Sequence, residues 1–179
     1  MKTLAFDTAT SLGAVCALST GEYARRATAG ELLAAVDELV DDPAELDAIV
    51  AGRGPGSFTG IRIGLATGRS LAQTLDVPLK GASTLDGFAA GALPVIDARR
   101  GEVFVPGPRV CRPEQLDVDG KVLVGDGAVR YRGVFEESGA TVPSDDDPAH
   151  VPDPLLYLAH ATDDVEPLYV RDPDARPRP

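Results

Sequence analysis

The chain has 179 residues, a length that suits one domain or two small lobes sharing a core. Its apolar fraction of 44% and charged fraction of 25% are typical of folded proteins and exclude a disordered chain. The net charge of −11 repels phosphate backbones and anionic lipids, so we expect neither nucleic acid nor a membrane to be a direct partner.

The apolar runs and the cysteines predict a cytoplasmic protein. The longest charge-free stretch, residues 8–21, has 14 residues, whereas a membrane-spanning helix needs roughly 20 apolar ones. Only four apolar or small-polar positions, residues 3–6, lie between Lys2 and Asp7, which leaves no room for the apolar core of a signal peptide. Cys16 and Cys111 form no disulfide framework, and we expect both to be buried thiols in a reducing compartment.

Two stretches of the chain repeat one strand-turn-strand plan. Residues 4–7 form a short apolar strand that ends in Asp7, and a turn leads to a second apolar run at 13–18. In the second stretch, the first strand ends in Asp97. The chain then turns through Arg99-Arg100-Gly101 and returns as a strand at 102–105. Each plan is typical of a β-hairpin.

The repeat continues further along the chain. Residues 48–51 are a buried strand that runs into Gly52-Arg53-Gly54 and a helix, and residues 122–127 follow the same order. This twice-used order predicts an α/β fold of two related lobes with mixed sheets and an abbreviated second lobe. The alternative is a chance similarity between short strands.

Helices are expected between these strands. Five apolar residues at helical spacing fall on one arc of about 120° and predict an amphipathic helix over residues 31–40; they are Leu32, Leu33, Val36, Leu39 and Val40. Capping residues predict shorter helices over 42–45, 85–91 and 153–161. Residues 167–171 are expected to form a closing strand or strap.

Charged residues and prolines are unevenly distributed along the chain. Residues 1–100 carry a net charge of −3 and residues 101–179 carry −8, and eleven of the 15 prolines follow Val105. We therefore expect a regular first lobe over 1–100 and a looser second lobe over 101–171, whose last helix packs back on the first. Residues 172–179 are expected to be a disordered tail.

The densest local pattern is the glycine-rich stretch at 52–64. A strand, a glycine loop and a helix together direct backbone N–H groups at an anion. However, no lysine follows Gly60 as a P-loop needs, and Thr59 stands where the Rossmann pattern has its third glycine. Pro55 stands where a nucleophile elbow requires glycine. We therefore favour a tight connection built for packing over a phosphate cradle.

The helix after this loop carries a ridge of small residues. Gly60, Gly64, Gly68 and Ala72 stand four apart, with Ile61 and Leu65 among the apolar residues beside them. Interior glycine costs roughly 1 kcal/mol relative to alanine, so the ridge indicates a close approach by another backbone. That backbone belongs either to the sheet of the same lobe or to a helix of a partner.

Candidate catalytic residues are few. Asp7 and Asp97 each end a buried strand beside a turn, where a carboxylate can hold a metal or act as a base, but no lysine lies next to Asp7. His150 and His160 are ten apart with prolines between them, which is not the spacing of metal ligands on a helix. We expect no metal site and no catalytic residue in this chain.

Residues 54–65 resemble the TsaB family of tRNA-modification proteins closely. The motif residues are Gly54, Pro55, Gly56, Ser57, Phe58, Thr59, Gly60 and Arg62. Segments at 6–10, 96–104 and 167–171 support the resemblance, so it spans nearly the whole chain in order. The second lobe is shorter than in typical members, and residues 25–30 lack a histidine that the family has there.

The resemblance implies an actin-like, sugar-kinase-like fold of two lobes and no catalysis by this chain. In the family, TsaD carries the metal and transfers a threonylcarbamoyl group to the tRNA adenosine next to the anticodon, and the ATPase TsaE joins the assembly. It implies a TsaB–TsaD heterodimer, a homodimer when the subunit is alone, and contact with tRNA only through the complex. It implies no intrinsic cofactor, with ATP or ADP bound within the complex.

The resemblance also assigns the docking helices to residues 31–40 and 60–75. The expected partner interface is Leu32, Leu33, Val36, Leu39, Val40, Ile61, Gly64, Leu65, Gly68 and Ala72. Asp7 and Asp97 would be the remains of a degenerate nucleotide cleft. The alternative function is a stand-alone ATP-dependent phosphotransferase or hydrolase with its site between the lobes and these two carboxylates in it.

Overall fold

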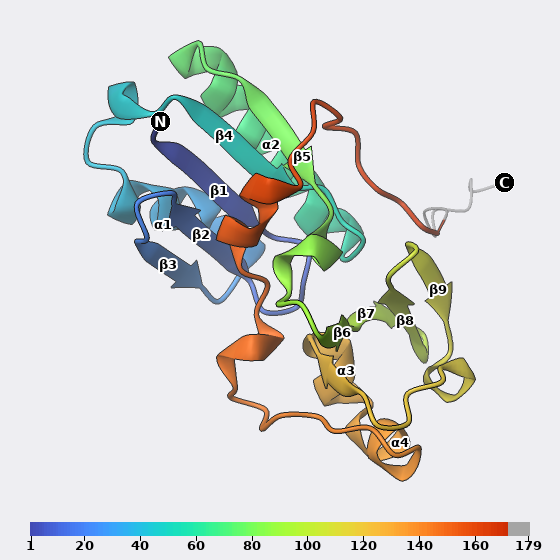
Figure 1. Cartoon of the computed structure of the whole chain (residues 1–179). Helices are drawn as coiled ribbons and strands as arrows, with labels where there is room; N and C mark the ends of the chain where they lie inside the picture. The colour runs from blue at the N-terminus through green and yellow to red at the C-terminus, as the bar shows by residue number, and fades with distance from the viewer. Residues whose placement is uncertain (172–179) are drawn as a thin grey trace, which may run out of the picture.

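The computed structural model describes residues 1–171, which form two lobes joined side by side (Figure 1). The first lobe is built on a five-stranded sheet in the order β3-β2-β1-β4-β5. Its strands are β1 (Thr3–Asp7), β2 (Ala14–Leu18), β3 (Tyr23–Arg26), β4 (Ala48–Gly52) and β5 (Leu79–Ala82). β1, β2 and β3 are antiparallel, whereas β4 and β5 run parallel to β1.

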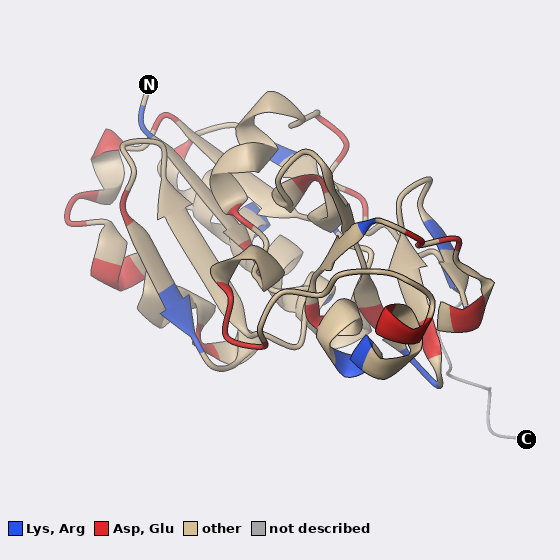
Figure 2. Ribbon diagram, turned by 60° about the horizontal axis from the view of Figure 1, so that its bottom comes forward, with Lys and Arg blue, Asp and Glu red and all other residues tan. Residues whose placement is uncertain are grey.

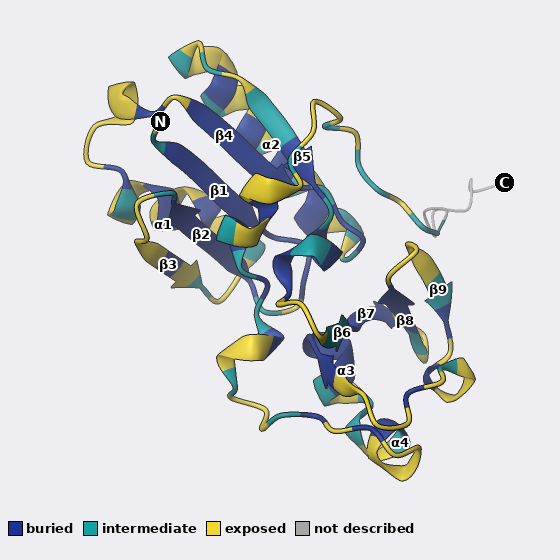
Figure 3. Ribbon diagram, viewed as in Figure 1, coloured by how far each residue is buried: buried dark blue, intermediate teal, exposed yellow. Residues whose placement is uncertain are grey.

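Both faces of this sheet are covered, so its central strands are fully buried (Figure 3). The helices α1 (Leu32–Leu39) and α2 (Phe58–Leu75) pack on one face, against side chains such as Phe6 and Ile49. The 3₁₀-helix η6 (Pro154–Ala159) covers the other face, where Tyr157 packs among Ala5, Val50 and Ala82. β1 therefore alternates between the two cores.

Local chemistry sets the ends of the two helices. The short helix η1 (Ala29–Glu31) leads into α1 with a capping box between Thr28 and Glu31. The side chain of Ser57 accepts a hydrogen bond from the N–H of Gly60 at 3.2 Å and so begins α2. α2 ends where Asp76 adopts the left-handed conformation, at a φ of 53°.

The second lobe repeats the strand order of the first. Its strands are β6 (Ala92–Pro94), β7 (Ile96–Arg99), β8 (Glu102–Val105), β9 (Arg109–Cys111) and β10 (Val122–Val124). The N–H of Val95 donates to the carbonyl of Val124 at 2.8 Å, so residues 92–99 run as one interrupted strand. With β7-β8-β9 antiparallel and β10 parallel to β6, the order matches β3-β2-β1-β4, and the predicted repeat is confirmed.

The second lobe is shorter because several elements are reduced. The helices α3 (Asp126–Arg130) and α4 (Arg132–Glu137) follow β10 as α2 follows β4. A single bridge between Val122 and Thr141 stands in the place of β5. Only the 3₁₀-turn η4 (Pro113–Gln115) lies between β9 and β10, where the first lobe has α1.

Some elements differ from the sequence prediction. The helix expected over 85–91 is only the 3₁₀-turn η3 (Thr84–Gly87), because the backbone is already extended at Phe88, with φ −113° and ψ 145°. The 42–45 helix is the 3₁₀-turn η2 (Pro43–Glu45), and the last helix is also 3₁₀. Residues 92–99 were expected in the first lobe but pair with strands of the second, so the sheets change before residue 100.

Two further observations concern the whole described chain. Cys16 and Cys111 are both free and buried, and burial raises the pKa of the Cys16 thiol to about 12. Among residues 1–171, no helix combines the length and apolarity needed to cross a bilayer. The tail expected over 172–179 lies outside the described residues.

Candidate functional site

The glycine-rich loop after β4 is held against the turn that follows β1. The N–H of Ser57 donates to the carbonyl of Ala9 at 2.6 Å, and the Thr8 hydroxyl donates to the carbonyl of Gly60 at 2.8 Å. A Cβ atom at Gly56 would lie 2.3 Å from the Ala9 oxygen, and one at Gly60 would lie 2.0 Å from the Thr8 oxygen. Only glycine permits this approach, and Gly56 and Ser57 also line a cavity between the lobes.

Asp7 is a structural carboxylate and not part of an open site. Its side chain accepts hydrogen bonds from the N–H of Ala9 at 2.6 Å and from the hydroxyls of Thr84 and Tyr157, both at 2.8 Å. It is 1% exposed, and burial raises its pKa despite these three hydrogen bonds. A Cβ atom at Gly52 would lie 1.8 Å from Asp7 Oδ2. Asp7 thus joins the end of β1 to the segments that carry Thr84 and Tyr157.

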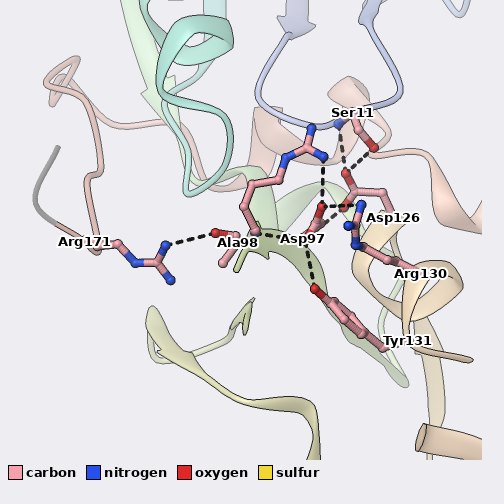
Figure 4. A network of polar contacts seen from close by, with 8 residues as sticks. Ser11, Asp97, Ala98, Asp126, Arg130, Tyr131 and Arg171 are labelled. Atoms are coloured by element: carbon pink, nitrogen blue, oxygen red, sulfur yellow. Dashed lines mark hydrogen bonds and ion pairs between the residues drawn. The ribbon is translucent and has the colours of Figure 1, made fainter. Parts of the chain in front are cut away.

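Asp97, by contrast, lines a cavity of about 420 Å³ between the lobes. Its carboxylate accepts the N–H of Arg99 at 2.9 Å and lies 3.4 Å and 3.5 Å from the guanidinium groups of Arg99 and Arg130 (Figure 4). The hydroxyl of Tyr131 approaches it at 3.5 Å. The two aspartates expected together in a nucleotide cleft are therefore separated: Asp97 lines the cavity and Asp7 does not.

Asp126 is the carboxylate that joins the two lobes, and the sequence analysis did not single it out. It accepts hydrogen bonds from the N–H and the hydroxyl of Ser11, at 2.8 Å and 2.7 Å, and from the N–H of Asp97 at 2.9 Å (Figure 4). Its position in Gly125-Asp126-Gly127, at the start of α3, was the available signal. The two carboxylates that line the cavity, Asp97 and Asp126, are thus both engaged by hydrogen bonds from within the chain.

Residues 164–171 form the strap that closes one side of this cavity. Arg53 pairs with Asp164 at 2.9 Å, and the N–H of Leu168 donates to the Arg53 carbonyl at 2.7 Å. At its far end, Arg171 donates to the carbonyl of Ala98 at 3.1 Å and pairs with Glu102 in the second lobe. The expected strap is present, but it is irregular chain with bends and not a strand.

The strap rests on an aromatic stack with the first turn of α2. The ring of Tyr169 stacks on Phe58 with 4.9 Å between centroids, and the guanidinium of Arg62 lies 3.9 Å from the Phe58 centroid. Arg62 also donates to the Tyr169 hydroxyl at 3.1 Å, and Arg69 pairs with Glu166 at 3.1 Å. These two arginines hold the strap.

Tyr169→Ala is expected to lower the free energy of unfolding by about 1–2 kcal/mol, because the stack and the Arg62 hydrogen bond are both lost. Tyr169→Phe keeps the stack and loses only the hydroxyl, so we expect a loss below about 1 kcal/mol. Urea denaturation followed by circular dichroism measures both. Equal losses in the two variants would show that the stack contributes nothing.

The partner surface predicted from the sequence needs correction. Of its ten residues, eight are buried within the first lobe: Leu32, Val36, Val40, Ile61, Gly64, Leu65, Gly68 and Ala72. The small-residue ridge faces the sheet, since a Cβ atom at Gly64 would lie 2.5 Å from the Thr8 hydroxyl and one at Gly68 would lie 3.2 Å from Phe6. The apolar stripe of a helix is the side that its own core covers. Only Leu33, 58% exposed, and the half-buried Leu39 remain available.

The outer faces of α1 and α2 nevertheless form an apolar groove. Two adjoining hollows of about 390 Å³ and 340 Å³ share Leu33 and Leu71. Small side chains of α2 line the outer hollow: Ala66, Thr67, Ser70 and Thr74. We call the two hollows together the helical groove, and the first of them its inner hollow. A second line of small residues, beside the glycine ridge, was the sequence signal for it.

The described residues contain no metal site of the usual kind. Among residues 1–171, no three His, Cys, Asp or Glu side chains come close enough to share an ion. His150 accepts a hydrogen bond from the N–H of Gly125 at 3.1 Å, and its Nε2 lies 3.1 Å from the carbonyl of Pro143. Both ring nitrogens are therefore used to hold the second lobe together.

Comparisons with known proteins agree with this architecture. The TsaD family model, described as tRNA N6-adenosine threonylcarbamoyltransferase, matches residues 21–118. An uncharacterized protein of Mycobacterium tuberculosis is 34% identical over 178 residues, covering 93% of this chain and 83% of that protein. The tRNA threonylcarbamoyladenosine biosynthesis protein TsaB of Haemophilus influenzae is 30% identical over 179 residues, covering 75% of this chain and 76% of TsaB.

A solved structure has a similar fold. The crystal structure of an uncharacterized protein of Pseudomonas aeruginosa, described as similar to peptidase YEAZ, superposes with a TM-score of 0.73 at 27% identity. The match covers 95% of this chain and 99% of that one.

Two lobes built on one repeated strand order, together with a family match over more than half of the chain, define an actin-like protein of the TsaD class. Within that class, the relatives that carry a functional name and align with most of this chain are TsaB proteins. The chain belongs to the TsaB family, and the resemblance found at residues 54–65 is confirmed.

Proposed function

We propose that this protein takes part in tRNA threonylcarbamoyladenosine biosynthesis as a non-catalytic subunit that binds and activates TsaD. The names of its relatives support the pathway. The helical groove carries the docking part of the proposal, because it exposes Leu33 beside small side chains on two helices of the first lobe. Exposed apolar surface lined by small residues is suited to receive side chains of a partner helix.

The cavity between the lobes supports a non-catalytic role. Asp97 and Asp126 are both engaged by hydrogen bonds from their own chain, and among residues 1–171 the cations that line the cavity are Arg99 and Arg171, with no lysine. Asp7, the first-lobe carboxylate of the phosphotransferase alternative, is buried away from it. ATP turnover by the purified chain alone, lost in Asp97→Asn, would overturn this part of the proposal.

The wider assembly follows from the family. We propose TsaE as the ATPase of the assembly, ATP or ADP bound within the complex and not by this chain alone, and tRNA contact only through the complex. Self-association of the lone subunit would use the same helical groove, with lower affinity than TsaD. The two buried free thiols support a cytoplasmic location.

Ser70→Arg is expected to weaken binding to the TsaD of the same organism by about 100-fold, because a long charged side chain would fill the groove. Ser70 is exposed near the middle of α2, so the fold should be unchanged. Calorimetric titration measures the affinity, and a threonylcarbamoylation assay with and without the subunit measures the function.

Ser138→Arg is the matched control, since Ser138 is equally exposed at the end of α4 in the other lobe. It should bind TsaD with wild-type affinity. If Ser70→Arg also did so, the groove would not be the docking surface. If TsaD were equally active without the subunit, the proposed function would fail.

A further inference from the structure

The helical groove borders a strongly acidic segment of the chain. Residues 27–52 contain seven acidic residues and no Lys or Arg: Glu31, Asp37, Glu38, Asp41, Asp42, Glu45 and Asp47. This segment includes α1 and the loop that follows it, whose ribbon carries acidic and no basic positions in Figure 2. The groove therefore has one strongly negative side.

Three of these acids form ion pairs with cations, and they lie away from the groove. Glu38 pairs with Arg26 on β3, and Glu45 pairs with Lys2 at 2.8 Å. Asp47 lies 3.8 Å from the N-terminal amine. None of these three carboxylates lines either hollow.

Asp37, the acid that lines the groove, has no such cation, whereas Glu45 together with the charge of Asp41 raises the pKa of Lys2. Asp37 lines the inner hollow and forms no ion pair with any residue of the described chain. Asp41 and Asp42 lie between Val40 and Pro43, which both line the same hollow. The side chain of Asp42 accepts the N–H of Ala44 at 2.9 Å, a contact that leaves its negative charge uncompensated by a cation.

The helix α2, on the opposite side of the groove, supplies no positive charge to it. Arg62 and Arg69, the two arginines of α2, are turned toward the strap, where they contact Tyr169 and Glu166. Among the described residues, neither hollow is lined by Lys or Arg. An occupant of the groove therefore meets apolar side chains flanked by uncompensated negative charge.

We infer that the groove selects a partner helix surface whose apolar residues are flanked by Lys or Arg, and that it disfavours a second copy of this chain. A two-fold dimer through the groove places the same patch on both copies, so acid would face acid. Like charges across an interface are repulsive, whereas a basic flank would attract and steer the partner. The inference rests on the proposed function for the location of the docking surface and adds the charge of the partner.

The test combines salt dependence with charge reversal at the groove. Asp37→Lys/Asp41→Lys is expected to bind the TsaD of the same organism about tenfold more weakly at 50 mM salt, and about twofold more weakly at 500 mM, because salt screens the interaction. The same variant should self-associate about tenfold more tightly at 50 mM salt, since the repulsion between copies is removed. Calorimetry measures the first effect and analytical ultracentrifugation the second.

Glu114→Lys/Glu137→Lys changes the net charge equally in the second lobe and is the control. Both residues are exposed, and we expect this variant to keep wild-type affinity in both measurements to within about twofold. If the control and the groove variant behaved alike, net charge and not the groove would be responsible, and the inference would be overturned.

The two proposals fail in different ways. Wild-type protein that binds TsaD equally well at low and high salt would overturn this inference and leave the proposed function intact. Wild-type protein that binds no TsaD at any salt would contradict the proposed function. The self-association measurement would then still decide the inference, and an unchanged dimer affinity in the groove variant would reject it.

Discussion

Replacing Gly64 with leucine is expected to unfold the first lobe and not merely to remove partner binding. A Cβ atom at this position would lie 2.5 Å from the Thr8 hydroxyl and 3.9 Å from the ring of Phe6. A leucine adds three further carbon atoms in the same direction, where β1 already fills the space. Inserting bulk into a packed core costs about 1–3 kcal/mol and occasionally more, and we expect about 4 kcal/mol here because the neighbour is the sheet itself. Urea denaturation measures the loss.

Ala66→Leu is the matched control on the outer side of the same helix. Ala66 is exposed and lines the helical groove, so its leucine variant should keep its free energy of unfolding within about 0.5 kcal/mol. Gly64→Ala tests the geometry with one carbon atom, and it should also be destabilising although alanine favours helices. A Gly64→Leu protein of wild-type stability that had lost TsaD binding would restore the small-residue ridge as the partner surface.

The ridge shows what a helical period can and cannot predict. The spacing of Gly60, Gly64 and Gly68 located a close approach correctly, because the absence of side chains is a local property of the sequence. The spacing does not indicate whether that backbone belongs to the sheet of the same lobe or to a helix of a partner. That choice depends on β1, which lies more than 50 residues earlier, so both alternatives stayed open until the sheet was placed.

The elements with strong local signals were predicted well. β8 occupies the predicted residues 102–105, and α2 begins two residues before the predicted start and ends at residue 75 as predicted. The repeated hairpin and glycine-loop order predicted the two lobes, because apolar runs and glycine punctuation are visible without tertiary contacts.

The contacts that join the lobes could not be predicted in the same way. Ser11 and Asp126 are 115 positions apart, and Arg62 and Tyr169 are 107 apart. Nothing in the local sequence of either partner identifies the other. Asp7 shows the same limit, since its strand-end position suggested chemistry until Tyr157 was found to close over it.

Asp7→Ala is expected to be among the most destabilising single changes in the first lobe. It leaves the N–H of Ala9 and the hydroxyls of Thr84 and Tyr157 buried without their acceptor. An unsatisfied buried polar group costs about 1–3 kcal/mol, and the three are coupled, so we expect a total loss of about 3–5 kcal/mol. Asp7→Asn keeps one acceptor oxygen and should cost less, as should Tyr157→Phe, which removes a single donor.

The pH dependence separates this role from general strain. Because burial raises the pKa of Asp7 above its ordinary value of 3.8, its contribution to stability is fully present below pH 3.8 and is lost as pH rises through the higher folded pKa. Asp7→Asn does not titrate, so its stability deficit relative to wild type should be largest near pH 3.8 and shrink toward neutral pH. Asp163→Ala, at an exposed carboxylate, should track wild type throughout. A deficit of Asp7→Asn that stayed constant with pH would mean that Asp7 has the same pKa in the folded and unfolded chains.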